Sequence, residues 1–148
     1  MKSIGWFHNV YLIMNLVINE DLLRKCGGGS DEYWFSYNDY SVMNISEFDT
    51  DDKPDDMGQT TYFVSIGIIP FVSVSNEEIM RSFVKAKGSA KLNAILDKVT
   101  ADDFIETFWK YFNAYPELKD GLDEFASEYT LNKVIDWCKE NNVNYTVE

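Results

Sequence analysis

The hydrophobic period of the chain changes near residue 75. Before this point apolar and polar residues tend to alternate with a period of two, and after it apolar residues recur about every 3.6 positions. Strands followed by helices are typical of an α+β domain with an antiparallel sheet. We therefore expect a strand-rich part, 1–75, that includes a short helix, and a helix-rich part, 76–148, with four to five helices packed on one face of the sheet.

The first apolar run, 10–18, is aliphatic and partly β-branched. Asn19 follows it as a good helix N-cap, with two acidic residues in the first turn, and glycines come directly after Cys26. These signals predict a strand that leads into a short helix. A single helix over 10–26 is the alternative, because the same glycines would end it equally well.

The segment 33–45 predicts a β-hairpin around the turn residues Asn38 and Asp39. Successive side chains of a strand point to opposite faces, so its first strand has a face with Tyr33, Phe35 and Tyr37 and a face with Trp34, Ser36 and Asn38. The second face is the more polar one. We therefore expect it to lie outward, with Trp34 exposed.

A second alternating run, 60–75, follows the acidic loop 46–59 and predicts another strand. Pro70 interrupts this run and has no amide hydrogen to donate to a neighbouring strand. The strand is therefore expected to bend, break or lie at a sheet edge there. Residues 71–74 could form a separate strand.

Capping patterns mark the starts of the expected helices. The sequences 75–78 and 100–103 have the form of capping boxes, and the helices that follow are expected to end at Gly88 and before Pro116, with one more helix between them. Further along we expect a short helix around 118–125 and a last helix that begins at Thr130 and ends at 141–142. Residues 143–147 could return as a short strand.

Length and composition favour one domain over the whole chain, 1–148. A chain of 148 residues with 45% apolar residues can bury one sizeable core, and a second domain has no room. The nine-residue apolar run at 10–18 is too short to cross a membrane and lacks the pattern of an export signal. Cys26 and Cys138 are far apart without metal or redox spacing, so a cytoplasmic location is the simplest expectation.

The charge of the chain is strongly uneven. Its net charge is −12, and residues 31–56 hold nine acidic side chains but only one basic one, Lys53. Such a concentration belongs to a solvated segment or to a surface that meets a positive partner.

No catalytic or metal motif is apparent. His8 is the only histidine, and a dyad with Cys26 is disfavoured because Cys26 ends a predicted helix, where the dipole opposes a thiolate. Counted from Asp49, a calcium loop would need a glycine where Pro54 stands and an acidic ligand where Lys53 stands. We expect no enzyme activity, no cofactor and no specific metal site, and leave open loose binding of a divalent ion by the acidic loop.

Direct binding to nucleic acid is not expected either. The chain has two arginines, and its lysines are spread among acidic residues, with the densest group at 85–91. That group suits the C-terminal end of a helix, where positive charge complements the dipole.

These observations favour a binding module that neutralises a basic protein. The leading hypothesis is an immunity protein that blocks a nuclease-type bacterial toxin by fast, electrostatically steered capture. The alternatives are a DNA mimic that inhibits a restriction or defence nuclease, and an acidic globular domain with no inhibitory role. The expected partner-binding residues are Asp31, Glu32, Trp34, Asp39, Glu47, Asp49, Asp51, Asp52, Asp55 and Asp56.

Three segments also resemble an uncharacterised family of small acidic bacterial proteins. They are Asp31-Glu32-Tyr33 at the start of an aromatic strand, Pro70-Phe71-Val72 leading toward Glu78 and Phe83, and the closing run from Trp137 to Val143. Because that family has no assigned activity, the resemblance implies a shared topology and no function.

Overall fold

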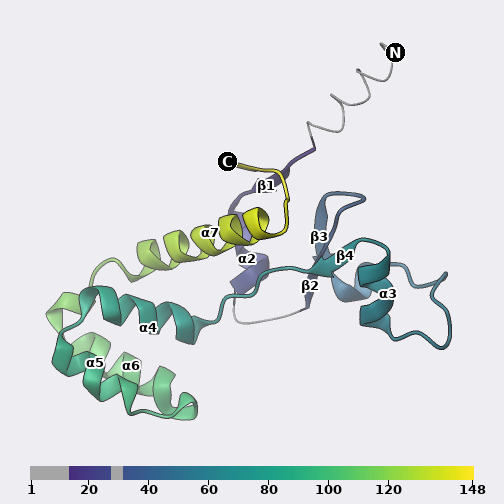
Figure 1. The fold of residues 1–148 in the computed structure, drawn as a ribbon. Helices are drawn as coiled ribbons and strands as arrows, with labels where there is room; N and C mark the ends of the chain where they lie inside the picture. The colour runs from purple at the N-terminus through teal and green to yellow at the C-terminus, as the bar shows by residue number, and fades with distance from the viewer. Residues whose placement is uncertain (1–13, 28–31) are drawn as a thin grey trace.

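The computed structural model describes residues 14–27 and 32–148, and within them it contains six α-helices and five short strands. The strands form two small sheets, and the first three helices of the second half extend away from them (Figure 1). The expected mixed α+β class is therefore confirmed. The expected single antiparallel sheet is not, because one of the two sheets is parallel.

The parallel sheet joins two segments that are far apart in the sequence. Strand β1 (Leu16–Ile18) pairs with β5 (Tyr145–Val147), with Leu16 opposite Tyr145. Helix α2 (Glu20–Cys26) follows β1, and the Asn19 side chain accepts a hydrogen bond from the Leu22 amide at 3.0 Å. The predicted order of strand and short helix is correct for the described residues, and residues 10–13 of the predicted strand lie outside them.

The antiparallel sheet has the order β3-β2-β4, so β2 is its central strand. Strands β2 (Tyr33–Ser36) and β3 (Ser41–Asn44) form the predicted hairpin, with the turn at residues 37–40. Strand β4 (Ile68–Pro70) is an edge strand that ends at Pro70. Its edge position agrees with the expectation for a proline that cannot donate to a neighbouring strand.

Both faces of β2 are buried, and this overturns the prediction of an exposed Trp34. The Phe35 ring lies 5.4 Å from the Trp137 ring on one face, and the Trp34 ring lies 5.8 Å from the Phe63 ring on the other. Trp34 is only 6% exposed and Ser36 only 2%. The prediction assumed that one face of the sheet would meet solvent, whereas a helix covers that face.

The covering helix is α3 (Gln59–Ser65), in a segment where the alternating pattern predicted a strand. The strand prediction for 60–75 is wrong except over 68–70. Helix α3 buries two adjacent residues, Tyr62 and Phe63, which a strand would have placed on opposite faces. Residues 71–74 form no strand, although the Phe71 and Val74 amides donate to the Tyr33 and Cys26 carbonyls at 3.0 and 2.7 Å.

The second half is helical, as predicted, but the prediction that its helices all pack on one face of the sheet is wrong: only the last one packs against the sheets, and the others form a separate cluster. It contains α4 (Asn76–Lys87), α5 (Ala90–Asp97), α6 (Ala101–Ala114), the 3₁₀ helix η3 (Pro116–Leu118) and α7 (Leu122–Glu140). The capping box at the start of α4 is formed, whereas the Thr100 side chain caps no amide of α6. The predicted helix start at Thr130 is wrong, because Thr130 is buried inside the continuous helix α7.

Three hydrophobic clusters hold the fold together. The sheet cluster lies between the sheets, α2 and α7 and contains Leu16, Ile18, Leu22, Cys26, Phe35, Val42, Phe71, Val134, Cys138 and Val143. The helical cluster contains Met80, Phe83, Val84, Leu92, Leu96, Phe104, Phe108 and Leu118. The α3 cluster contains Trp34, Phe48, Tyr62, Phe63 and Ile68.

Trp34→Ala is expected to destabilise the protein by about 3 to 5 kcal/mol, because it removes a buried indole from the α3 cluster and leaves a cavity. Denaturant unfolding followed by circular dichroism would measure this loss. Trp109→Ala is the matched control: Trp109 is 41% exposed, so its truncation should cost about 1 kcal/mol or less. Equal losses for the two variants would contradict the assignment of Trp34 to the core.

Candidate functional site

The acidic segment, 47–56, is the main candidate for a binding surface. It begins in the 3₁₀ helix η2 (Ile45–Glu47), where the Asn44 side chain and the Glu47 side chain form a capping box. Phe48 is buried in the α3 cluster and anchors the segment to the body of the molecule. The carboxylates of Asp51, Asp52, Asp55 and Asp56 follow this anchor and are exposed.

The one cation of the acidic segment does not neutralise its carboxylates. The Lys53 Nζ donates instead to the Pro54 and Met57 carbonyl oxygens, at 3.0 and 2.7 Å. Asp49 accepts a hydrogen bond from the Asp51 amide at 2.8 Å, which helps to shape the turn. Among the described residues, the ion pairs are Arg24 with Asp21, Arg81 with Glu77 and Lys133 with Glu78, so none involves this segment.

The structure groups some of the predicted partner-binding residues and separates others. Glu32 lies at the same end of the hairpin as the acidic segment, because its carbonyl accepts from the Ile45 amide at 2.7 Å. Asp39 is exposed in the turn at the opposite end of β3. Trp34 is buried and is therefore not part of the binding surface, and Asp31 lies outside the described residues.

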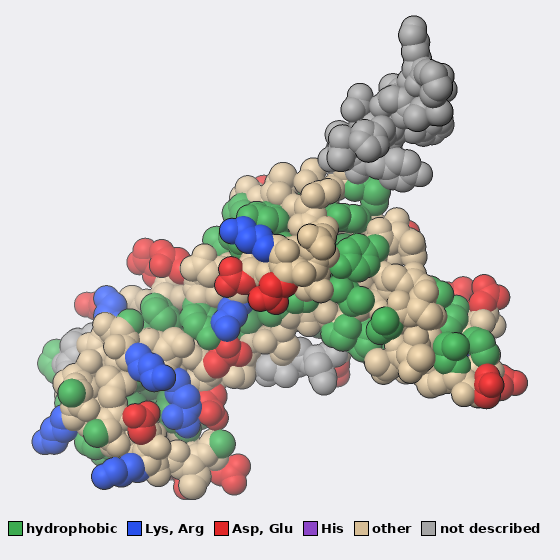
Figure 2. Space-filling view, in the orientation of Figure 1, with side chains coloured by type: hydrophobic (Ala, Val, Ile, Leu, Met, Phe, Trp, Pro, Cys, Tyr) green, Lys and Arg blue, Asp and Glu red, His purple; other side chains and the backbone are tan. Residues whose placement is uncertain are grey.

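Two further exposed apolar side chains lie on α3 and in the turn after it, and the second of them, Ile66, lies beside the 37–40 turn, where its carbonyl accepts from Asn38 Nδ2 at 2.9 Å. Val64 is 53% exposed and Ile66 is 37% exposed. Figure 2 shows hydrophobic side chains between acidic ones on the lobe that carries α3. Both residues belong to a segment whose alternating pattern predicted a strand, so nothing in the sequence indicated their exposure on a helix and turn.

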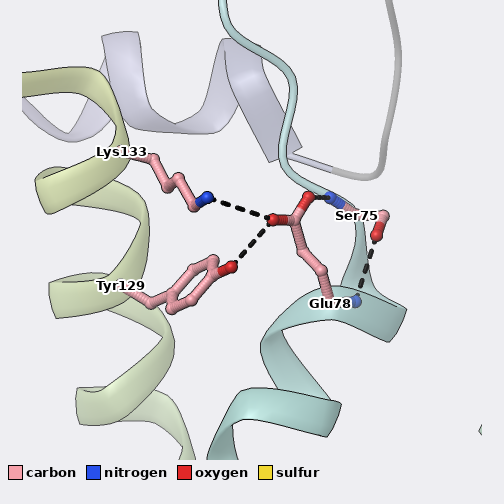
Figure 3. A network of polar contacts seen from close by, with 4 residues as sticks. All are labelled: Ser75, Glu78, Tyr129 and Lys133. Carbon is pink, nitrogen blue, oxygen red and sulfur yellow. Dashed lines mark hydrogen bonds and ion pairs between the residues drawn. The ribbon is translucent and has the colours of Figure 1, made fainter. Parts of the chain in front are cut away.

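A polar network around Glu78 connects α4 to α7 (Figure 3). Glu78 Oε1 accepts from the Ser75 amide at 2.9 Å as part of the capping box, and Glu78 Oε2 accepts from the Tyr129 hydroxyl at 2.8 Å. Lys133 Nζ lies 3.9 Å from the same Oε2. Oε1 thus caps the start of α4, and Oε2 links α4 to α7. We interpret this network as a structural joint between the two helices.

The thiols of Cys26 and Cys138 are both buried, so we expect them to react slowly with thiol reagents. Burial raises the pKa of Cys26 and that of Cys138 to about 11. Cys138 lies on the buried face of α7, and Cys26 ends α2 with its Sγ 3.1 Å from the Leu23 carbonyl oxygen. His8, the partner in the disfavoured dyad with Cys26, lies outside the described residues.

Residues 14–27 and 32–148 contain no group of three or more His, Cys, Asp or Glu side chains placed to hold a metal ion. Nor does any helix in that part of the chain have the length and apolar character needed to cross a membrane. No protein-family model, curated protein or solved structure matches the chain. The resemblance to a family of small acidic bacterial proteins therefore stays a prediction.

The Glu78 joint can be tested with a double-mutant cycle of Tyr129→Phe and Glu78→Gln. We expect a coupling energy of about 0.5 to 1.5 kcal/mol in denaturant unfolding, the usual contribution of such a hydrogen bond. Lys133→Gln is the control on the same carboxylate oxygen and should cost less than about 0.5 kcal/mol, because the pair is long and half exposed. A coupling near zero for Tyr129 would show that the hydroxyl does not join the two helices.

The raised thiol pKa values predict that both cysteines react slowly with thiol reagents and that the folded protein loses stability at alkaline pH. At pH 8 the thiolate fraction of the folded protein should be about 100-fold below that of the unfolded chain, because the pKa rises from 9.0 to about 11.

The same shift predicts a loss of stability at alkaline pH. The stability that the buried thiols contribute is complete below pH 9 and is lost as the pH rises through about 11, since only the unfolded chain ionises them in this window. A disulfide-exchange dye and unfolding at pH 8 to 11 measure the two effects.

The control is the double variant Cys26→Ala, Cys138→Ala, which should lose this part of the alkaline slope while other titrations remain. Rapid labelling of the native protein at pH 8 would contradict the buried placement of both thiols.

Proposed function

We propose that this protein is an acidic binding module that captures and neutralises a basic protein, and that it acts by binding and not by catalysis. The observation that carries this proposal is the set of exposed, uncompensated carboxylates at Asp51, Asp52, Asp55 and Asp56. Their only neighbouring cation, Lys53, is turned toward backbone carbonyls. The segment therefore presents nearly its full negative charge to solvent.

A fixed cluster of like charges has a defined physical effect on association. It raises the encounter rate with a positively charged partner, and salt weakens this effect because the Debye length is about 8 Å at physiological ionic strength. Phe48 and the η2 capping box hold one end of the segment in place, which reduces the ordering that binding requires. Preorganisation of this kind favours affinity.

A close protein–protein contact needs apolar area as well as charge. Helix α3 and the turn after this helix provide apolar area. Val64 is exposed on α3, and Ile66 is exposed beside the hairpin turn that carries Asp39. An apolar centre with a polar rim is the usual arrangement of a protein interface. These two residues replace Trp34, which is buried, as the apolar part of the proposed surface.

The partner class that suits this surface best is a protein that itself binds nucleic acid, because such proteins carry clustered positive charge. We therefore retain an immunity protein of the cytoplasm that blocks a nuclease-type bacterial toxin as the proposed role. The carboxylates of the acidic segment would occupy the positions at which the toxin binds phosphates.

Affinity capture from the native host at low salt, followed by elution at high salt, tests the proposal. We expect a single basic protein that elutes as salt rises and whose nuclease activity falls when this protein is added back. Capture of no basic protein, or of one with unchanged activity, would contradict the proposed function.

The quadruple variant Asp51→Asn, Asp52→Asn, Asp55→Asn, Asp56→Asn should then bind the captured protein about tenfold more slowly at low salt, with little change in thermal stability. The matched control removes four exposed carboxylates elsewhere: Glu20→Gln, Asp97→Asn, Asp136→Asn and Glu140→Gln. The control should slow association much less, because its charges are scattered over other elements. Equal association rates for the two variants would exclude the acidic segment from the interface.

A further inference from the structure

Another surface with exposed apolar residues, aromatic ones among them, lies on α6, in the helical part and well away from α3 (Figure 1). Its apolar residues are Ile105, Trp109 and Phe112, which follow one another at spacings of four and three and so share one side of the helix. Trp109 is 41% exposed and Ile105 37% exposed. We name this group, with the hollow described next, the Trp109 surface.

The exposed indole is held in place by neighbouring rings. The Trp109 ring contacts the Phe108 and Phe112 rings edge to face, both at 5.2 Å between centroids. Phe108 itself is fully buried in the helical cluster. Trp109 therefore stands on a rigid base, as residues that contribute strongly to protein interfaces commonly do.

An open hollow of about 490 Å³ lies beside Trp109 and Phe112. Leu122 adds apolar surface to its lining, and Asp120, Asp123 and Glu124 add three carboxylates. Two more carboxylates, Asp102 and Glu106, lie seven and three positions before Trp109 on α6 and are exposed. An indole with an acidic rim on both sides is thus the main feature of this surface.

The positive groups near this rim leave it negative. Lys119 lines the hollow and Lys87 lies beside Gly121, so two cations stand against the three carboxylates of the hollow. On α6, Glu106 lines a neighbouring hollow together with Lys98 and Lys110. None of these carboxylates belongs to an ion pair within the described part of the chain. Asp123 and Glu124 also lie in the first turn of α7, where the helix dipole offsets a fraction of their charge.

We propose that the Trp109 surface binds an arginine side chain, with an adjoining apolar residue, from a basic segment of a partner protein. The guanidinium group would lie over the indole, where a cation is attracted to the ring, and would meet the carboxylates of the rim. The apolar neighbour would cover Ile105 and Phe112. Charge favours this occupant over a second copy of the chain, because two copies would place acidic rims against each other and each carries a net charge of −12.

This proposal does not depend on the acidic segment, because the residues involved belong to α6, the turn after η3 and α7. It concerns a separate surface with its own partner chemistry. Loss of binding at one surface is expected to leave the other intact.

The test is an NMR titration of the full-length, nitrogen-15 labelled protein with a capped peptide of alternating arginine and leucine residues. We expect saturable shifts of the Trp109 indole resonance and of the amides of residues 119–124. A peptide with glutamine in place of arginine should bind at least about threefold more weakly, because it lacks the charge that the rim attracts.

Three variants make the test specific. Asp120→Asn, Asp123→Asn, Glu124→Gln together should weaken peptide binding about three- to tenfold, in proportion to the screened charge that is lost. Trp109→Leu keeps apolar area but removes the aromatic ring, and it should weaken the arginine peptide more than the glutamine peptide. Substitution of the four aspartates at 51, 52, 55 and 56 by Asn should leave the shifts at Trp109 unchanged.

The proposal is overturned if the arginine peptide shifts no resonance of the Trp109 surface, or shifts only residues of the acidic segment. Equal binding of the arginine and glutamine peptides would also overturn it, since charge would then play no part. A shift of the Trp109 indole with protein concentration alone would show that a second copy occupies the surface.

Discussion

The burial of both faces of β2 is the constraint on which the rest of this fold depends. Its odd and even residues belong to different clusters, Phe35 to the sheet cluster and Trp34 to the α3 cluster. A strand that is buried on both faces needs a covering layer on each face. Helix α7 covers the Phe35 face, and helix α3 covers the Trp34 face. Helix α7 in turn reaches the helical cluster through Leu122 and Phe125, so the three clusters form one connected interior.

This arrangement leaves the charges of the molecule divided between its parts. Residues 47–56 hold six acidic side chains against one lysine, whereas the helical part, 76–148, holds fourteen acidic side chains against nine basic ones. Figure 2 shows acidic side chains on the lobe that carries α3 and many basic ones on the helical part. The negative charge is therefore densest on the lobe that carries α3, and this asymmetry would orient the protein in the field of a charged partner before contact.

The sequence predicted the elements whose signals are local. The Ser75 capping box, the Asn38-Asp39 turn and the end of α6 before Pro116 are set by neighbouring residues, and all three were correct. The errors concern partners distant in sequence. Trp34 is buried because α3 covers it, and the alternation at 62–66 fits a strand as well as a short helix when the covering surface is unknown. For the same reason, the exposed Trp109 could not be told from a core residue.

The pairing of β1 with β5 imposes an order on events during synthesis. Tyr145 is added 129 positions after Leu16, which at 5–20 residues per second is a delay of roughly 6 to 26 s. During this time Leu16 and Ile18, both buried in the folded protein, have no strand to pair with. The hairpin and the helical part can form from local contacts in the interval, whereas the parallel sheet must close last. Residues 145–147 therefore complete the environment of a strand that is synthesised 129 positions earlier.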